Sequence, residues 1–435
     1  MSLRSHRKLV KYALVAAIAS LNSAAYAALP CVSASKLPAV SGTVVNVATD
    51  AELQNAVSNQ QDNMTILLQQ GVYNLSSTLY IRKKNVTIRG NGSLCDKVIL
   101  AGKGMENSNY GSVPHGIWSD AISLSVMNLT IKDVYYHGIV YNSGAQSPLV
   151  DSVQLLNTGQ QFIKSNPTSY GVGVDNGTVK NSRLAYENGP PMTDHGGGTG
   201  YTNGVDVHAG KNWVISGNYF ENFHTPDSAT NLWNPAILMW NGAAGTLSEN
   251  NVFINVDRAI AYGLIDRSGQ YDHSGGIIRN NMIYYASGLF SAARTYDSDG
   301  AIIVWNSPGT AVAHNTILSN GNLNRSIEFR FDTTGAQALN NLADVSIGSR
   351  NSAVFTQTGN IFGAKADMFA GASTGNLRLV QTATAAINKV NRVTAAPFDI
   401  DGNERIGQGT VDAGASEYGA MSPPSPPINP TGQQI

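Results

Sequence analysis

The hexapeptide ISGNYF (residues 215–220) is the best copy of a pattern that recurs through the middle of the chain. The pattern is an apolar residue, two variable positions, Asn or Ser, one variable position and a second apolar residue. Other copies are LSENNV (247–252), IRNNMI (278–283) and VAHNTI (312–317). The polar anchors are 30, 36, 32, 31 and 34 residues apart, at Ser152, Ser182, Asn218, Asn250, Asn281 and Asn315. A period of this length is typical of a solenoid.

Each repeat contains short β-rich runs separated by Gly, Asn and Asp, and none contains a long amphipathic helix. Helical arrays are therefore disfavoured. A propeller is the structural alternative, but its blades need four antiparallel strands, whereas the recurring units here are single short strands. Stacked Asn side chains can also hydrogen-bond along a column. The pattern predicts an all-β fold, a right-handed parallel β-helix over residues 80–397.

The ends of the chain suggest how the solenoid is closed. The segment TDAE (49–52) is a capping box that predicts a short helix to about Ser58, with Leu53, Ala56 and Val57 on one face. This helix, in an amino-terminal segment spanning 28–79, would cap the first coil, because a bare coil leaves an open sheet edge. Residues 398–420 are turn-rich and predict a closing segment. Residues 421–435 predict a disordered Pro-rich tail.

The amino terminus resembles a secretory signal. A basic region, with Arg4, Arg7, Lys8 and Lys11, precedes the mainly small, apolar run 12–21 and the cleavage motif AYA (25–27). The alternative, a transmembrane anchor, is disfavoured because the run is too short. We expect a signal peptide over 1–27, cleavage after Ala27, and a secreted or periplasmic protein. There, Cys31 and Cys95 are expected to form a disulfide, with two buried free thiols as the alternative.

Charge limits the possible partners. Removing the signal takes away four basic residues and no acidic ones, so Lys+Arg falls from 28 to 24 against 29 Asp+Glu, a net charge of −5. A nucleic-acid-binding protein would show a basic excess. We therefore expect no nucleic-acid partner. We also expect no membrane anchor, since no stretch after the signal is long and apolar enough to span a bilayer, and a monomer.

Several motifs together resemble a known superfamily. The signal, the Ala-Glu-Leu helix, and the segments GVYNLSSTLYI (71–81) and NVTIRG (85–90) are similar to those of the pectin-lyase-like superfamily of right-handed β-helix proteins. The nearest in style are polysaccharide lyases of the chondroitinase B and alginate lyase kind. The segment 398–419 is similar to the end of many bacterial β-helix proteins without an assigned activity. The resemblance covers most of the mature chain and implies a protein active on carbohydrate. The superfamily also includes hydrolases, epimerases and non-enzymes.

A second set of strands lies between the anchors: GIVYN (138–142), FIKSN (162–166), GVDVH (204–208), AILMW (236–240), AIAYG (259–263), AIIVW (301–305) and SIEFR (326–330). Side chains alternate between the faces of a strand, so the second position of each forms an inward apolar column. Two outward columns follow. One is Val140, Lys164, Asp206, Leu238, Ala261, Ile303 and Glu328, and the other is Asn142, Asn166, His208, Trp240, Gly263, Trp305 and Arg330.

The outward columns place ionisable and aromatic residues on neighbouring coils. Coils stack about 4.8 Å apart, so Lys164, Asp206 and His208 should be within reach of one another. We predict that these three are catalytic, and that a glycan groove includes Asn166, Trp240, Trp305, Arg330 and, from the insertion 187–203, Asp194 and His195. The alternative is an ordinary exposed sheet with a Lys–Asp ion pair, tryptophans covered by loops, and a flexible surface insertion.

Three functions remain open. A polysaccharide lyase would cleave a uronic-acid polymer by β-elimination, with Lys164 or His208 as the base and Asp206 orienting His208. Arg330 could bind only the carboxylate of another sugar. A non-catalytic polysaccharide-binding surface or matrix protein would use the same groove. A glycoside hydrolase would need two carboxylates, and Asp194 could supply the second from the insertion.

No cofactor is predicted, and calcium is a weakly supported alternative. Calcium needs several convergent oxygens, and the stripe offers only Asp206 and Glu328, on distant coils. This pattern departs from that of calcium-dependent pectate lyases. The paired-aspartate motifs of polygalacturonases and the acidic pair of chondroitinase-type enzymes are also missing from the sequence.

Overall fold

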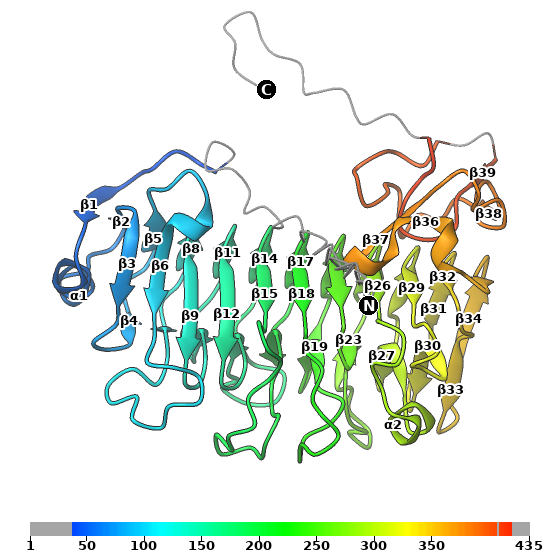
Figure 1. Ribbon diagram of the computed structural model, residues 1–435, viewed down its shortest axis with the longest axis horizontal. Coiled ribbons are helices and arrows are strands. Elements are labelled where there is room, and N and C mark those ends of the chain that lie inside the picture. The colour runs from blue at the N-terminus through cyan, green and yellow to red at the C-terminus, as the bar shows by residue number, and fades with distance from the viewer. Residues whose placement is uncertain (1–36, 407–408, 420–435) are drawn as a thin grey trace, which may run out of the picture.

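Three long parallel sheets wind around one apolar core in the computed structural model, which describes residues 37–406 and 409–419 (Figure 1). Each complete coil contributes one strand to sheet A, then one to sheet B, then one to sheet C. The fold is the predicted right-handed parallel β-helix. The predicted signal peptide, Cys31 and the Pro-rich tail lie outside the described residues, so these features and the disulfide to Cys95 stay predictions.

Sheet A consists of β1 (Thr43–Val47), β2 (Met64–Leu68), β5 (Thr87–Gly90), β8 (Ser125–Met127), β11 (Leu149–Asp151), β14 (Thr178–Lys180), β17 (Val214–Ser216), β21 (Leu247–Glu249), β25 (Ile277–Arg279), β28 (Ala311–Ala313), β31 (Ala336–Leu339) and β34 (Phe355–Thr358). Sheet B consists of β3 (Gly71–Asn74), β6 (Val98–Ala101), β9 (Thr130–Val134), β12 (Gln154–Thr158), β15 (Arg183–Ala185), β18 (Tyr219–Glu221), β22 (Val252–Ile254), β26 (Met282–Tyr284), β29 (Thr316–Leu318), β32 (Leu342–Ala343) and β35 (Ile361–Phe362). Sheet C consists of β4 (Leu79–Ile81), β7 (Ile117–Ser119), β10 (Ile139–Tyr141), β13 (Ile163–Ser165), β16 (Val205–His208), β19 (Pro235–Trp240), β23 (Arg258–Tyr262), β27 (Gly300–Trp305), β30 (Arg325–Arg330) and β33 (Gly348–Arg350).

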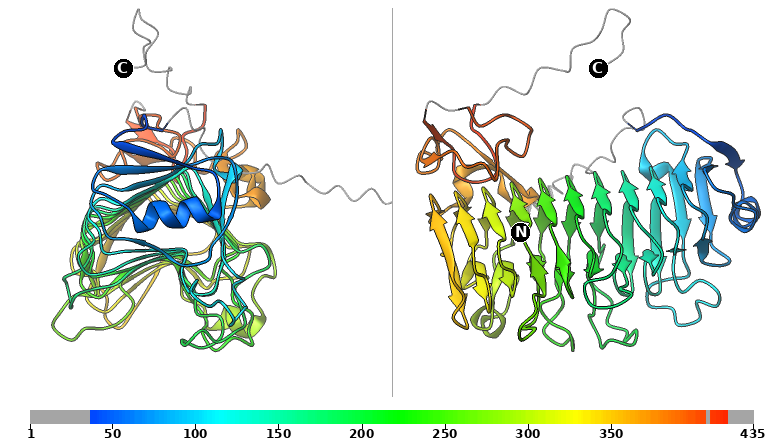
Figure 2. Two further views of the ribbon diagram at one scale, coloured as in Figure 1. Left: turned by 90° about the vertical axis from the view of Figure 1, so that its left-hand side faces the viewer. Right: turned by 180° about the vertical axis from the view of Figure 1, so that it is seen from behind.

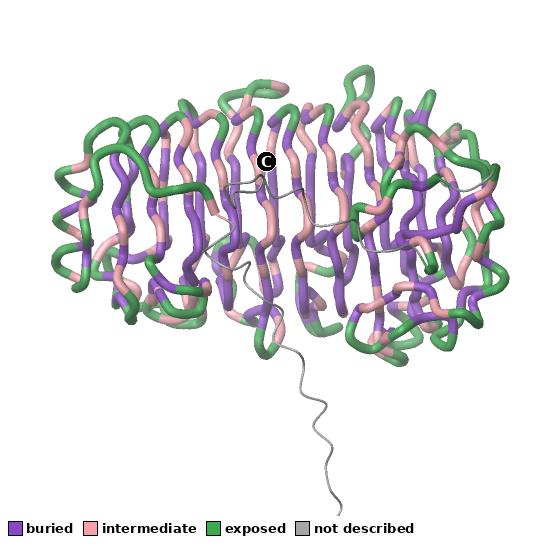
Figure 3. Tube along the Cα trace, turned by 90° about the horizontal axis from the view of Figure 1, so that it is seen from above, coloured by how far each residue is buried: buried purple, intermediate pink, exposed green. Residues whose placement is uncertain are grey.

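The remaining elements lie outside these sheets. They are the helices α1 (Asp50–Ser58) and α2 (Ala292–Tyr296), the strand pairs β20 (Ala243–Ala244) with β24 (His273–Ser274), β36 (Phe369–Gly371) with β37 (Asn376–Leu379) and β38 (Val390–Asn391) with β39 (Thr410–Val411), and the short 3-10 turns η2 (Cys95–Lys97), η3 (Ala366–Met368) and η4 (Ala372–Thr374). Neither helix is long and apolar enough to cross a membrane within the described residues. The buried positions follow the strands, and the exposed ones gather in turns and loops (Figure 3).

The predicted capping helix is confirmed as α1. Thr49 Oγ1 accepts a hydrogen bond from the backbone N–H of Glu52 at 3.2 Å, and Glu52 Oε2 accepts one from the N–H of Ala48 at 2.7 Å. The helix buries Leu53, Ala56 and Val57 and lies across the open end of the first coil (Figure 2). It shields the core where no further coil can stack.

The turn between sheets A and B accounts for the Asn repeat and shows that two of the predicted anchors were wrong. One residue adopts a left-handed conformation, and the next points into the core, where the Asn side chains hydrogen-bond along a column at 2.9–3.0 Å. The column is Asn218, Asn251, Asn281, Asn315, Asn341 and Asn360.

Ser152 and Asn250 were wrongly predicted as column members. Both are left-handed turn residues, with φ of 58° and 56°. The strand register pairs Ile215 with Ser248, not with Leu247. The motif LSENNV contains two consecutive Asn residues, so the sequence alignment was wrong by one position. In the coil of Ser152, the inward position of the column is held by the next residue, Val153, which is fully buried.

The carboxyl-terminal segment folds back over the outer face of sheet B. Its β36–β39 region lies beside β26, β29 and β32 (Figure 1). A separate apolar cluster joins outward side chains of sheet B, such as Ile254 and Leu342, to Leu377, Val411 and Ala413. The parallel sheets therefore run from Thr43 to Phe362, which differs from the expected limits of 80 and 397 at both ends.

Candidate functional site

The register of sheet C is the one that the alternation of side chains predicts. Ile139, Ile163 and Val205 are paired in order, and the same column continues through Ile237, Ile260, Ile302 and Ile327, all fully buried. Lys164 therefore stands opposite Asp206, and His208 opposite Trp240.

Four of the predicted site residues make direct contact on the outward face of β13, β16 and β19. Lys164 forms an ion pair with Asp206, and its Nζ lies 2.7 Å from Nε2 of His208. Nε2 of His208 lies 3.5 Å from Oδ1 of Asp206. Trp240 Nε1 donates a hydrogen bond to the same oxygen at 2.9 Å, and its ring centroid lies 4.5 Å from that of His208. We call Lys164, Asp206, His208 and Trp240 the sheet C cluster.

Access to the cluster is uneven. The Asp206 side chain is fully buried, whereas the Lys164 and His208 side chains are 10% and 17% exposed. Burial alone would raise the pKa of Asp206, but the charge of Lys164 and the hydrogen bond to His208 outweigh it and hold that pKa well below its ordinary value. Asp206 is thus a permanent carboxylate that orients its neighbours, and His208 and Trp240 present the more open edge.

Two histidines beside the cluster were missed by the sequence analysis. His115 and His137 precede β7 and β10, and their rings stack with centroids 5.0 Å apart. Burial lowers the pKa of His115 to about 4, and burial together with His115 and Lys164 lowers that of His137 strongly, so both are neutral at pH 7. Nδ1 of each ring is buried and has no hydrogen-bond partner among the described residues. The repeated tripeptide HGI, at 115–117 and 137–139, was the available signal.

The insertion 187–203 brings Tyr201, and not the predicted Asp194 and His195, near Asp206 of the sheet C cluster. The Tyr201 hydroxyl hydrogen-bonds the side chain of Gln161, and burial, reinforced by the negative charge of Asp206, raises its pKa to about 12. Tyr201 therefore keeps its proton at neutral pH. On the opposite side, the guanidinium of Arg267 lies 6.0 Å from the Trp240 ring and 5.6 Å from the Tyr170 ring.

Asp194 and His195 stabilise the insertion itself. The exposed Asp194 carboxylate accepts hydrogen bonds from the backbone N–H groups of Gly196 and Gly198 at 2.8 and 2.9 Å, which lower its pKa. His195 is buried, with Nε2 2.6 Å from the backbone oxygen of Met105. These contacts fix the loop and do not join either side chain to Asp206.

The other predicted ligand-binding residues, Trp305, Arg330 and Asn166, contact neighbouring side chains of the protein. Trp305 is only 6% exposed, its Nε1 donates to Glu328 at 3.1 Å, and the Arg330 guanidinium lies 4.7 Å from its ring. This is the covered tryptophan of the alternative interpretation. Asn166 is half-buried and donates to Asn142 at 2.9 Å.

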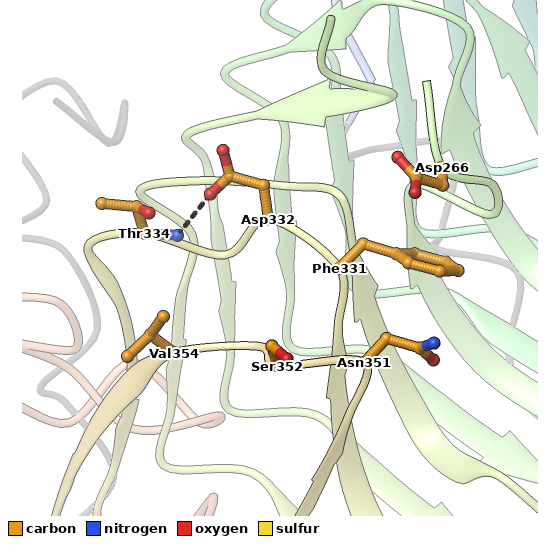
Figure 4. Close-up of a pocket in the computed structure, with 7 residues that line it drawn as sticks. All are labelled: Asp266, Phe331, Asp332, Thr334, Asn351, Ser352 and Val354. Atoms are coloured by element: carbon orange, nitrogen blue, oxygen red, sulfur yellow. Dashed lines mark hydrogen bonds between the residues drawn. The ribbon is translucent and has the colours of Figure 1, made fainter. Parts of the chain in front are cut away.

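Two hollows lie away from the cluster. One, of about 560 Å³, contains Asp266, Phe331 and Asp332, and the Asp332 carboxylate accepts a hydrogen bond from the N–H of Thr334 (Figure 4). The second is lined by residues of the connections from sheet B to sheet C. No group of three or more His, Cys, Asp or Glu side chains within the described residues is placed to hold a metal ion.

Three parallel sheets around a continuous core, with a polar cluster on the outer face of one of them, define a right-handed parallel β-helix protein. The sequence matches no protein-family profile and no curated protein. The structure is similar to the tailspike protein of E. coli bacteriophage HK620 in complex with a pentasaccharide, at 12% identity and a TM-score of 0.50, covering 75% of this chain and 59% of the tailspike.

Two further solved structures are similar at lower scores. An alginate lyase from Paenibacillus sp. str. FPU-7 has 16% identity and a TM-score of 0.46, covering 74% of this chain and 95% of the lyase. Pectate lyase Pel9A has 12% identity and a TM-score of 0.46, covering 87% of this chain and 97% of the lyase. At these identities the likeness concerns the fold alone.

Proposed function

We propose that this protein is a polysaccharide lyase that cleaves a uronic-acid-containing polysaccharide by β-elimination. The observation that carries the proposal is the contact of 2.7 Å between Lys164 Nζ and His208 Nε2, beside the buried carboxylate of Asp206. The HK620 tailspike, which has a similar fold, was solved in complex with a pentasaccharide, so binding of a glycan is compatible with this kind of fold.

The short contact restricts the protons of the pair. One of the two facing nitrogens must donate and the other accept, so Lys164 and His208 cannot both present protons to each other. In the reactive form, the Lys164 ammonium of the ion pair has given up one proton, so its amine accepts from His208 Nε2–H and Nδ1 of His208 is left as a base. Asp206, which stays ionised, favours the return of a positive charge to the pair once Nδ1 has taken a proton.

His208 can then act as both the base and the acid of the elimination. His208 Nδ1 takes the proton from C5 of the uronate, the C5 electron pair forms the C4–C5 double bond, and the bond from C4 to the leaving oxygen breaks. The imidazolium gives its proton to that oxygen, which restores the neutral pair. General acid–base catalysis of this kind typically contributes about 10²–10⁴-fold to the rate.

Substrate contacts would come from the rim of the cluster. The half-exposed Trp240 ring offers an apolar face to the C–H surface of a sugar. Arg267, held by an ion pair of 2.7 Å to Asp272, stands over that ring and can bind the uronate carboxylate. Tyr201 can donate its hydroxyl proton in a hydrogen bond to a substrate oxygen.

The hydrolase alternative has less support. Hydrolysis needs two carboxylates about 5–9.5 Å apart, one of them able to carry a proton. Asp206 is a buried permanent carboxylate, and Asp194 is bonded to its own loop. A non-catalytic glycan-binding protein remains the second candidate, because Trp240 and Arg267 serve binding as well as catalysis.

The test is a screen of the purified protein against uronic-acid and neutral polysaccharides. Absorbance of the new C4–C5 double bond supports a lyase. New reducing ends without that absorbance indicate a hydrolase, and retention without products indicates a binder. Lys164→Ala should abolish the absorbance, whereas Lys83→Ala, at an exposed lysine, should not change it.

We also propose that the protein is secreted or periplasmic, processed after Ala27. The basic and apolar stretches that precede AYA (25–27) support this. Intact mass and amino-terminal sequencing of protein from each cell fraction test it. A cytoplasmic full-length product would contradict the proposal.

A further inference from the structure

A buried aspartate and a half-exposed histidine meet in the connections from sheet B to sheet C, outside the sheet C cluster. Nδ1 of His224 lies 2.7 Å from Oδ1 of Asp257. Asp257 is fully buried, and its second oxygen accepts from Thr225 Oγ1 at 2.7 Å and pairs with Arg294 at 2.6 Å. The Phe290 ring stacks on the imidazole at 5.2 Å. Three successive coils therefore fix the orientation of His224.

The pairing determines which nitrogen of His224 is available. A carboxylate paired with an arginine can only accept, so Nδ1 donates to Asp257, and Nε2 of the neutral ring is an acceptor. Within the described part of the chain, no hydrogen-bond partner contacts Nε2. The side chain is 20% exposed. His224 lines a hollow of about 480 Å³.

The lining of that hollow indicates a class of ligand. Pro190, Met192, Pro226 and Leu289 supply apolar surface, and amide side chains and Glu187 supply polar atoms. None of the lining residues is Lys or Arg, and Glu187 brings a negative charge. The nearby Arg294 side chain is only 2% exposed, and its bonds go to Asp257, Thr225 and Asp227.

We propose that this hollow is a second saccharide site that binds an uncharged sugar unit, with His224 Nε2 accepting a hydrogen bond from a ring hydroxyl. Apolar walls match the C–H faces of a sugar, and the acceptors match its hydroxyl groups. A uronate would meet Glu187 without a cation to compensate it. The site goes beyond the proposed lyase reaction and does not depend on it, because no residue of the sheet C cluster lines the hollow.

The test follows the His224 ring by NMR. Protein with ¹⁵N-labelled histidine is titrated with hexasaccharides of glucose, xylose, mannose and galactose, and separately with oligomers of galacturonate, mannuronate and guluronate. At least one neutral hexasaccharide should shift the His224 Nε2 signal, and the uronate oligomers should not. The fully buried His273 serves as the internal control and should not move.

Two variants separate the hydrogen bond from the cavity. His224→Phe keeps a ring against Phe290 and should weaken binding of the neutral hexasaccharide about five- to tenfold, the effect of losing one hydrogen bond. Leu289→Trp, at a half-buried position, should fill the hollow and abolish binding. The proposal is overturned if no neutral hexasaccharide shifts the signal, if the uronates shift it equally, or if both variants bind as the unaltered protein does. Lys164→Ala should bind the neutral sugar normally, so failure of the lyase proposal and failure of this one are distinguishable.

Discussion

Asp206→Asn should destabilise the protein strongly, although it removes no atom from the core. The Asp206 side chain is fully buried and pairs with a Lys164 side chain that is 10% exposed. The amide keeps an oxygen for Trp240 Nε1 but leaves the ammonium without a counter-charge. Removing one partner of a buried ion pair costs about 3–5 kcal/mol, and we expect the free energy of unfolding to fall by that amount.

The measurement is urea denaturation of four proteins: unaltered, Asp206→Asn, Lys164→Met, and the double variant. Each single change leaves one charge unpaired, whereas the double change removes both. The double variant should therefore be more stable than the sum of the two losses predicts, by at least about 2 kcal/mol. Additive losses, or a loss below about 1 kcal/mol for Asp206→Asn, would refute the reasoning that the pair is buried and coupled.

Further outcomes follow from the same structure. Asn251→Ala should cost about 3 kcal/mol or more in urea denaturation, because it leaves several buried hydrogen-bonding groups of the Asn column unpaired, whereas Asn250→Gly, at a left-handed turn position, should cost little. His208→Ala should lower kcat on the screened substrate by about 10²-fold or more at a temperature where the variant is folded, and a normal kcat would remove His208 from the mechanism. Because the pKa of His115 falls from 6.5 to about 4 on folding, the unfolded chain binds more protons in that window; stability should drop as the pH falls through it, and the drop should be smaller in His115→Phe than in the unaltered protein.

Sheet C could be predicted because its periodicity is simple. Side chains alternate with a period of two, and the buried column of Ile and Val fixes the parity of every other position. Parity alone placed Lys164 beside Asp206 and His208 beside Trp240, and the structure has the same pairs. The resemblance to the pectin-lyase-like superfamily agrees with the fold that these pairs require.

The positions that were misjudged depend on information outside that alternation. Asn250 and Asn251 differ in backbone conformation, and the sequence does not show which of two adjacent asparagines is the turn residue. His115 and Tyr201 lie in connections before strands, where no parity applies. Trp305 occupies an outward position, but Glu328 and Arg330 of the next coil cover it, and such cover depends on side-chain conformation.

The returning carboxyl-terminal segment has a consequence for synthesis. An exported chain emerges from the membrane in order, starting with β1 and α1, so each new coil can stack on a finished one. The apolar outer strip of sheet B around Ile254, Met282 and Leu342 is an exception, because the residues that cover it, such as Leu377, Val411 and Ala413, follow all the coils in the chain. Until then this strip is exposed on an otherwise complete solenoid. A chain that ends near residue 362 would therefore keep this apolar strip exposed, and we expect it to bind an apolar dye that the full chain does not bind.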